Sequence, residues 1–352
     1  MLKSIKNFAI AFLVSSIILG IAAAILMGSL EDVLTGSFNK SDNDISDILN
    51  NGGEEEPNDN GEVNTENALS RVDGSSFTIL AVMTDYRPDV YDYNLSSTDA
   101  KVGIFQDGVK RYGAAKICIV KCSKETGRFI FLPISPLTRV NTTAGYERLY
   151  DVYTDYGIDY LKAKLEAVTG LTIDRYAVIN CYGMSYLVNT IGAVWCTVPC
   201  DIYTNGTEYV SEAASKAAEK KDPKDTYWRF LEKCEDYIGP SSMGLLLFSD
   251  YTNGIEDELT VSSGYMKGIM KNLTNFPEES LGGYWENIKA GLTFTDIDAE
   301  FINNHAKLIK SYSDNLAKTV KMVGVFRTSG NDGRPYFDLD QTRTVDNLAG
   351  YR

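Results

Sequence analysis

The chain has 352 residues, a formal net charge of −14 at pH 7 and a single histidine. Residues 31–70 contain eleven acidic residues and one lysine, so most of the negative charge is concentrated there. A nucleic-acid-binding role is not expected, because such proteins need a basic surface to neutralise phosphates. A zinc site is not expected either, since the chain has one histidine and no Cys-x-x-Cys pair.

The N-terminus predicts a single membrane-spanning helix. Lys3 and Lys6 precede an uncharged run of 23 residues from Phe8 to Leu30, which is long enough to cross a hydrocarbon core. Because the lysines precede this run and acidic residues follow it, we expect a cytoplasmic N-terminus and an extracellular domain anchored in the cytoplasmic membrane. A cleaved signal peptide is the alternative, with residues 22–24 (Ala-Ala-Ala) as a weak cleavage site.

The acidic stretch that follows predicts a disordered linker. It is rich in Asn, Gly and Glu, so it cannot bury enough apolar surface to fold, and its like charges repel one another. The predicted organisation is a cytoplasmic N-terminus at 1–7, a transmembrane helix at 8–30, a linker at 31–73 and one extracellular domain at 74–352.

The first half of that domain alternates between strand and helix patterns. Short apolar runs predict strands, and apolar residues spaced by three and four predict helices. Turn residues at 123–127 join two strands into a hairpin, and Gly170 is a suitable helix end. The predicted strands are 77–83, 116–121, 129–134, 176–180 and 194–198, and the predicted helices are 158–168 and 184–191.

The second half is less regular. Residues 210–236 predict a polar helical insertion broken at Pro223. Helices are expected around 261–273 and 301–312, and strands at 320–326 and 336–339. Asp340 is placed to cap a last helix. The whole pattern indicates an α/β fold with a mixed central sheet and helices packed on it.

All six cysteines lie in the domain: Cys118, Cys122, Cys181, Cys196, Cys200 and Cys234. Several stand inside apolar runs, where cysteine serves as a small hydrophobic residue. The residues alone leave two possibilities open: buried thiols, or one or two disulfide bridges.

Few residues suggest chemistry. Asp85 and Arg87 follow the first strand, and α/β sheets bind ligands beyond the carboxyl ends of their strands. As an ordinary surface loop, however, the pair would have no role. His305 lies in a predicted helix without a Ser or Cys motif near it, so we expect a helix-surface histidine.

The order of segments carries more information than any one of them. Residues 79–87 form an apolar strand that ends in Asp-Tyr-Arg, and residues 117–120 with 126–128 form a second strand and turn. Residues 174–180 are a strand, and residues 191–199 read Ile-Gly-Ala-Val and end in Val-Pro. In this order the segments resemble the LytR-CpsA-Psr (LCP) family of Gram-positive cell envelopes, with the clearest likeness between 77 and about 200.

The resemblance implies a function. Members of the family have one membrane helix and an outer α/β domain, and they transfer polyprenyl-pyrophosphate-linked anionic polymers, such as teichoic acid or capsule, onto peptidoglycan with magnesium. Carried over to matching positions, it implies Asp85 as the metal ligand and Arg87, Arg139 and Arg148 as phosphate or lipid-phosphate ligands. The implied partners are a polyprenyl (pyro)phosphate-linked glycopolymer or a related enzyme.

The chain also departs from the family. The family's Arg-Ser-Asp falls on residues 113–115 (Gly-Ala-Ala), and its Pro-Arg-Asp falls on 135–137 (Ser-Pro-Leu). Its paired arginines would lie near 248–250, where no arginine occurs. Bidentate arginines stabilise a phosphoryl group during transfer, so their loss predicts weak catalysis. Three functions stay open: a binding protein for lipid-linked precursors with a degenerate site, an active phosphotransferase, and a non-catalytic interaction domain.

Overall fold

The computed structural model describes residues 76–85, 113–124, 127–206, 208–222, 224, 226–239, 243–249, 251–329 and 333–351. All of them belong to one unit, residues 64–352. The predicted transmembrane helix at 8–30, the linker at 31–73 and Arg87 lie outside these residues. Within the described ranges, no helix combines the length and the apolar character needed to cross a membrane.

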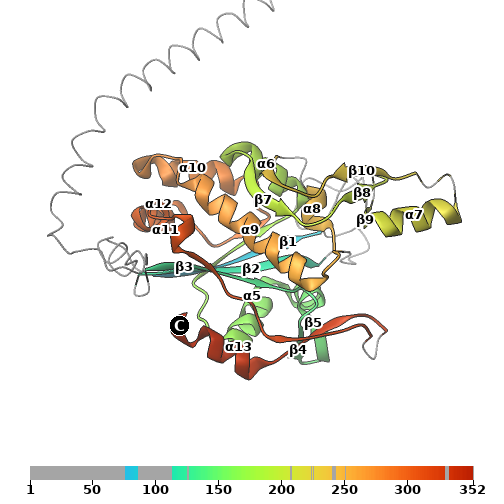
Figure 1. Ribbon diagram of the computed structural model, residues 1–352. Coiled ribbons are helices and arrows are strands. Elements are labelled where there is room, and N and C mark those ends of the chain that lie inside the picture. Colours follow the sequence, from blue (N-terminus) through green and yellow to red (C-terminus); the bar gives the residue numbers. More distant parts are fainter. Residues whose placement is uncertain are drawn as a thin grey trace, which may run out of the picture. The chain divides into compact units, whose positions relative to one another are not determined.

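A six-stranded mixed sheet forms the centre of the domain (Figure 1). Its strand order is β12-β6-β1-β2-β3-β13. Strands β1, β2 and β3 are antiparallel, whereas β6 runs parallel to β1 and β13 runs parallel to β3. The strands are β1 (Phe77–Thr84), β2 (Ala114–Ser123), β3 (Arg128–Ile134), β6 (Arg175–Ile179), β12 (Phe294–Thr295) and β13 (Ala317–Thr319).

Helices cover both faces of this sheet (Figure 1). One face packs against α5 (Leu149–Thr169) and α13 (Gln341–Leu348). The other face is covered by α6 (Cys181–Ile191), α8 (Met243–Leu247), α9 (Ile255–Leu273), α10 (Leu281–Lys289), α11 (Ala299–Asn304) and α12 (Ala306–Lys310). Strand β2 contributes alternate residues to the two cores: Ile117 and Ile119 face α5, and Cys118 and Val120 face the other helices. A strand buried on both faces is a continuous apolar run in the sequence.

Smaller elements surround the sheet. The hairpin of β4 (Arg139–Thr142) and β5 (Gly145–Arg148) leads directly into α5. A second hairpin near the C-terminus joins β14 (Gly324–Arg327) and β15 (Tyr336–Leu339). The remaining elements are β7 (Val194–Val198), β8 (Ile202–Thr204), β9 (Tyr209–Ser211), α7 (Glu212–Lys221), β10 (Trp228–Leu231), β11 (Cys234–Ile238), η3 (Glu278–Ser280), η4 (Asp314–Leu316) and η5 (Ala349–Tyr351).

The predicted mixed α/β fold and most of its elements in the first half are confirmed. Helix α5 ends at Gly170, whose backbone is left-handed with φ 68°, as the glycine suggested. The helix begins nine residues earlier than expected, because Gly157 with φ 81° interrupts the apolar spacing between its two parts. Asp340 caps α13 as predicted, with its Oδ1 accepting a hydrogen bond of 3.0 Å from Arg343 N.

Several predictions for the second half are wrong. The segment 210–236 is helical only in α7, and its later part forms strands β10 and β11. Strand β11 is polar, but it pairs with β7, which the local pattern does not reveal. The strand expected at 320–326 covers only 324–327, and the helix expected at 301–312 is divided at His305.

The histidine and the cysteines are also placed by the structure. His305 is not on the surface but buried, with Nδ1 2.7 Å from Phe301 O and its ring 5.2 Å from the Phe77 ring. All six cysteines are free thiols. Cys118, Cys122, Cys181 and Cys196 are buried, in agreement with their apolar neighbours, and the other two are half-buried.

Candidate functional site

Asp85 stands directly beyond the end of β1 and is held by two donors. Its Oδ1 accepts a hydrogen bond of 2.8 Å from Gly113 N, and its Oδ2 accepts one of 2.8 Å from the Tyr150 hydroxyl. Burial raises the pKa of Asp85, while these hydrogen bonds and the charge of Lys116 act in the opposite direction. The carboxylate therefore has a fixed orientation at the sheet edge.

Tyr150 fills the space beside Gly113. A Cβ atom on Gly113 would lie 2.5 Å from the Tyr150 ring, which is closer than real contacts allow. A side chain at position 113 is therefore incompatible with the observed position of the tyrosine. The family's arginine-bearing segment falls here, so the structure shows glycine and an inserted tyrosine where the resemblance would place a phosphate ligand.

Arg148 is buried at the end of β5 and bound to a carboxylate of its own helix turn. Its Nε and Nη2 donate to Asp151 Oδ2 at 2.8 and 2.6 Å. The other oxygen of Asp151 lies 3.6 Å from Arg334 Nη1. The charge of Arg148 is thus largely balanced inside the protein.

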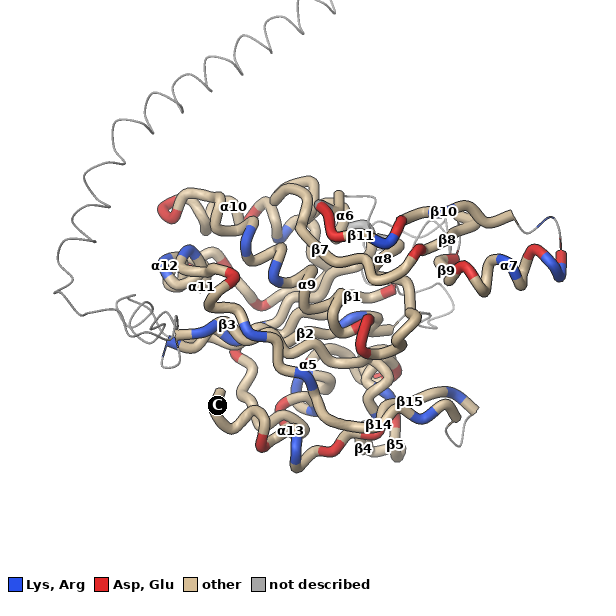
Figure 2. Tube along the Cα trace, viewed as in Figure 1, with Lys and Arg blue, Asp and Glu red and all other residues tan. Residues whose placement is uncertain are grey.

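Arg139 lies opposite Arg148 across the β4–β5 hairpin. Its Nη2 donates to Asp338 Oδ1 at 3.2 Å, and its guanidinium lies 4.1 Å from the centre of the Tyr336 ring and 4.8 Å from that of Tyr146. Arg139 and Arg148 face each other and repel, and the carboxylates of Asp338 and Asp151, which they bind, offset that repulsion. Figure 2 shows acidic and basic residues close together on the hairpins β4–β5 and β14–β15.

The segment before β4 is fastened to the start of α5. Pro136 O accepts from Tyr150 N at 2.9 Å, and Thr138 O accepts from Leu149 N at 2.9 Å. Ser135 Oγ accepts from Leu137 N at 3.3 Å, which closes the turn on itself. This turn therefore fixes the position of Tyr150 beside Asp85, and it presents no arginine where the family has one.

The structure thus brings three of the four predicted site residues to one region. Asp85 is joined through Tyr150 to the first turn of α5, which Arg148 precedes, and Arg139 lies across the hairpin from Arg148. Arg148 binds Asp151 and Arg139 binds Asp338, so the two arginines and the Asp85 carboxylate form neighbouring groups. Arg87 lies outside the described residues.

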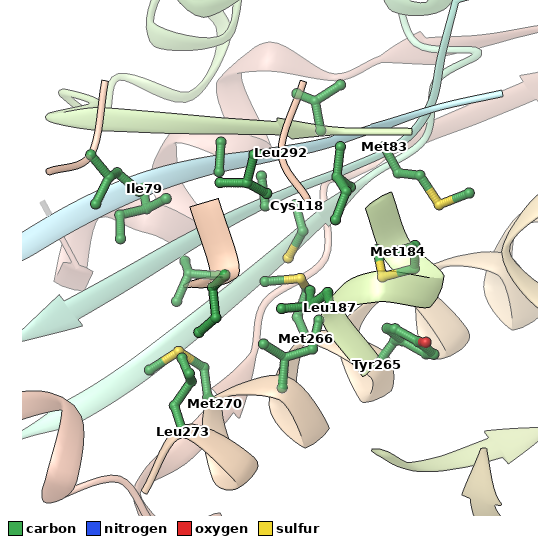
Figure 3. A pocket seen from close by; sticks show the side chains of 18 of the residues that line it. Ile79, Met83, Cys118, Met184, Leu187, Tyr265, Met266, Met270, Leu273 and Leu292 are labelled. Atoms are coloured by element: carbon green, nitrogen blue, oxygen red, sulfur yellow. The ribbon is translucent and has the colours of Figure 1, made fainter. Parts of the chain in front are cut away.

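An apolar cavity of about 160 Å³ lies on the face of the sheet that is turned away from α5. It is enclosed by β1, β2 and β6 and by the helices α6, α9 and α10. Its lining extends along β1 from Phe77 to Met83. Figure 3 shows Met83, Met184 and Met266 among the side chains that line it. The sequence analysis did not predict this cavity. The pair of methionines at 266 and 270 on the buried side of α9 could have indicated it, but such a pair is equally typical of a solid core.

Lys116 is the one charged residue among the described residues that line this cavity. Its Nζ donates to Glu258 Oε1 at 2.6 Å and to Phe248 O at 3.3 Å. Only 9% of its side chain and 8% of that of Glu258 are exposed. The lysine pairs with Met83 in the sheet, so it lies at the same end of β1 as Asp85. Sequence reasoning missed both residues, because their partners are distant in the chain.

A metal would have to rely on few protein ligands here. No group of three or more His, Cys, Asp or Glu side chains with metal-binding geometry occurs among the residues that the structure describes. Asp85 offers two carboxylate oxygens, each of which keeps a lone pair besides its hydrogen bond. Magnesium is often held by one or two carboxylates together with water and substrate phosphates, so the single carboxylate fits that mode of binding.

Comparison with known proteins places the fold. No protein-family model and no curated protein matches the chain. Among solved structures, Bacillus subtilis TagV is similar at 15% identity over 79% of this chain and 96% of that chain, with a TM-score of 0.58. A putative transcription regulator from Eubacterium siraeum is similar at 13% identity over 85% and 98% of the two chains, with a TM-score of 0.54. TagT bound to LI-WTA is similar at 13% identity over 78% and 91%, with a TM-score of 0.53.

TagV and TagT are LCP family proteins. At these identities the likeness concerns the fold, and it covers 78–85% of this chain. The resemblance inferred from the sequence is confirmed at that level: this chain is a divergent protein with the LytR-CpsA-Psr fold.

Proposed function

We propose that this chain is a membrane-anchored cell-envelope protein that binds polyprenyl-phosphate-linked precursors during cell-wall glycopolymer assembly, with a degenerate catalytic site. The observation that carries the proposal is the apolar cavity along β1, which ends at the sheet edge that holds Lys116 and Asp85. The complex of TagT with lipid-linked wall teichoic acid supports a ligand of the same class.

The cavity suits an apolar tail. By strand rise, the seven residues from Phe77 to Met83 span about 20 Å, so the lining is elongated. Its volume of about 160 Å³ is close to that of cavities that take up one small apolar molecule. A longer tail requires the walls to move, and the flexible methionine side chains that line the cavity can do so. An empty apolar cavity of this size costs on the order of 4 kcal/mol, which a bound tail would offset.

Weak catalysis follows from the state of the arginines. Transfer requires groups that stabilise the transition state more than the bound substrate. Arg148 and Arg139 are each paired with a carboxylate, and Tyr150 and Gly113 occupy the segment where a further arginine would be. Each missing donor of this kind can cost about 10² to 10³ in rate. We therefore expect binding with turnover at or near background.

Magnesium is part of the proposal. Asp85 would supply one hard oxygen ligand, and the precursor's phosphate and water would supply the others. Arg148 would contribute a charge-assisted hydrogen bond to the same phosphate. Magnesium held by Asp85 would place positive charge beside the phosphate, so binding of a polyprenyl phosphate should be stronger with magnesium than without it.

The test is a binding and turnover assay on the purified chain with a polyprenyl phosphate, with and without magnesium. Asp85→Asn should remove the magnesium dependence, and Arg148→Ala should weaken binding by about tenfold, the value of one charge-assisted hydrogen bond. Arg343→Ala is the matched control, because Arg343 is an exposed arginine on α13. Absence of any lipid binding would overturn the proposal and favour a non-catalytic, membrane-tethered interaction domain.

An active magnesium-dependent phosphotransferase that attaches anionic glycopolymers to peptidoglycan is the second candidate. It is favoured by one observation: Asp85 is still held in a fixed orientation at the strand end, next to the helix turn that begins after Arg148. Robust transfer by the unmodified chain, measured as release of polyprenyl phosphate, would establish this function and refute the degenerate site.

A further inference from the structure

A buried ion pair stands at one end of the apolar cavity. Lys116 comes from β2 and Glu258 from the first turns of α9, 142 residues away in the chain. Taking two charges out of water is expensive, and an apolar pair of similar size is often at least as stable. A pair of this kind at the wall of an otherwise uncharged cavity therefore suggests a role in binding.

Among the described residues, the lysine has acceptors for two of its three donors. An ammonium group has three N–H bonds, and Nζ uses one for Glu258 and one for Phe248 O. No further acceptor bonds it among the described residues, and the Tyr251 ring centre lies 6.0 Å away. The third N–H is thus available to an anionic oxygen without loss of the other two bonds.

The position of Lys116 matches one end of an elongated ligand. The cavity lining contains Phe77 at the start of β1 and Met83, the sheet partner of Lys116, near its end. A molecule with its apolar tail along β1 would bring a terminal charged group to Lys116. Asp85 lies two residues beyond Met83, at the same sheet edge.

We propose that Lys116 is a further residue that recognises the phosphate of a prenyl phosphate whose tail occupies the cavity, beside Arg148, and that Glu258 positions its ammonium group. This inference rests on the proposed lipid-binding function and assigns a recognition residue to it. Glu258 also opposes the ligand, because its negative charge repels the phosphate. Lys116 therefore distinguishes a charged prenyl lipid from a neutral one, and Glu258 limits how tightly the charged one is held.

The experiment compares two probes with the same tail, farnesyl phosphate and farnesol, by titration of the full chain in detergent. We expect the unmodified chain to bind farnesyl phosphate at least tenfold more tightly than farnesol. Lys116→Met should lose most of this preference, keeping only the share that Arg148 supplies, and keep its affinity for farnesol within about twofold. Glu258→Gln should enlarge the preference for the phosphate.

Two variants control for folding and for charge. Lys116→Met leaves Glu258 buried without its cation, so the double variant Lys116→Met with Glu258→Gln is included, and it too should lose most of the preference. Lys121→Met is the matched control, because Lys121 lies on the same strand an odd number of residues away and therefore faces the opposite side of the sheet. It should behave as the unmodified chain.

The outcomes separate the two proposals. If neither probe binds to the unmodified chain, the lipid-binding function itself fails. If both bind but the chain shows no preference, or if the variants without Lys116 keep the tenfold preference, the assignment of Lys116 is wrong and lipid binding stands. Loss of the preference in Lys121→Met as well would also overturn the assignment.

Discussion

Three residues decide what the sheet edge beyond β1 can do. Asp85 supplies a carboxylate at the position that the sequence pattern indicated. Gly113 and Tyr150 are its immediate neighbours. The tyrosine both donates a hydrogen bond to Asp85 and excludes any side chain at position 113. A single substitution to arginine would therefore not restore a ligand there, because Tyr150 would have to move and release Asp85.

Gly113→Ala tests this packing. The new Cβ would lie 2.5 Å from the Tyr150 ring, and relief of the clash should cost about 1–3 kcal/mol in the free energy of unfolding. Combining it with Tyr150→Ala should remove most of that added cost, as measured by a double-mutant cycle in urea. Gly283→Ala is the control, since a Cβ there meets nothing. Additive effects of the two substitutions would contradict the packing described.

The thiols should differ sharply in reactivity. Burial raises the pKa of Cys118 and of Cys196 to about 12, so at pH 8 only about 10⁻⁴ of each is thiolate, which is the reactive form. Cys200 and Cys234 are half-buried and should be alkylated first in the native protein. Mass spectrometry after timed alkylation provides the order. At least four free thiols should be found in denatured, unreduced protein; a count of zero would mean three bridges and contradict the structure.

At the scale of single elements, helix α13 depends on its first residue. Asp340 accepts a hydrogen bond from Arg343 N and so satisfies a backbone donor at the helix start. Asp340→Ala should lower the free energy of unfolding by about 0.5–2 kcal/mol. Asp346→Ala, in the same helix but away from its start, is the comparison. Equal losses for the two variants would mean that the cap contributes nothing.

The elements that the sequence predicts correctly are those whose signal is local. The strand from Phe77 is a continuous apolar run, and Gly170 and Asp340 are helix-end residues by their own chemistry. Strand β11 was missed because its residues are polar and its stability comes from pairing with β7. The lysine–glutamate pair was missed for the same reason, since its partners are 142 residues apart. The position of Asp85 at the end of its strand is also a local signal and is confirmed, whereas its role as a ligand stays a prediction.

At the scale of the whole molecule, filling the cavity should have opposite effects on thermal stability and on ligand binding. Ala81 lies on β1 in the cavity wall. Ala81→Leu should fill part of the empty space, so the melting temperature should stay equal or rise, while binding of a polyprenyl phosphate weakens by at least tenfold. Ala217→Leu, on the exposed side of α7, should alter neither quantity. Unimpaired lipid binding in Ala81→Leu would place the tail elsewhere.

The orientation of the chain in the membrane is a prediction of the sequence that needs its own experiment. Protease added to intact spheroplasts should remove residues 74–352 and leave the N-terminal segment in the membrane. Complete protection of the domain would show that it faces the cytoplasm. A soluble chain that begins after Ala24 would instead establish the cleaved signal peptide.

The strand order has a consequence for the time course of folding. The four inner strands are complete at Ile179, but both edges of the sheet are closed by segments from the last third of the chain, β12 on β6 and β13 on β3. Until those segments arrive, the backbone groups along the edges of β6 and β3 are unpaired, and such edges invite pairing with other chains. Contacts between distant segments also make folding slow. During synthesis, which starts at the N-terminus, both edges of the sheet therefore stay unpaired for a time. In that period a chaperone or another nascent chain has the largest unpaired strand surface to bind.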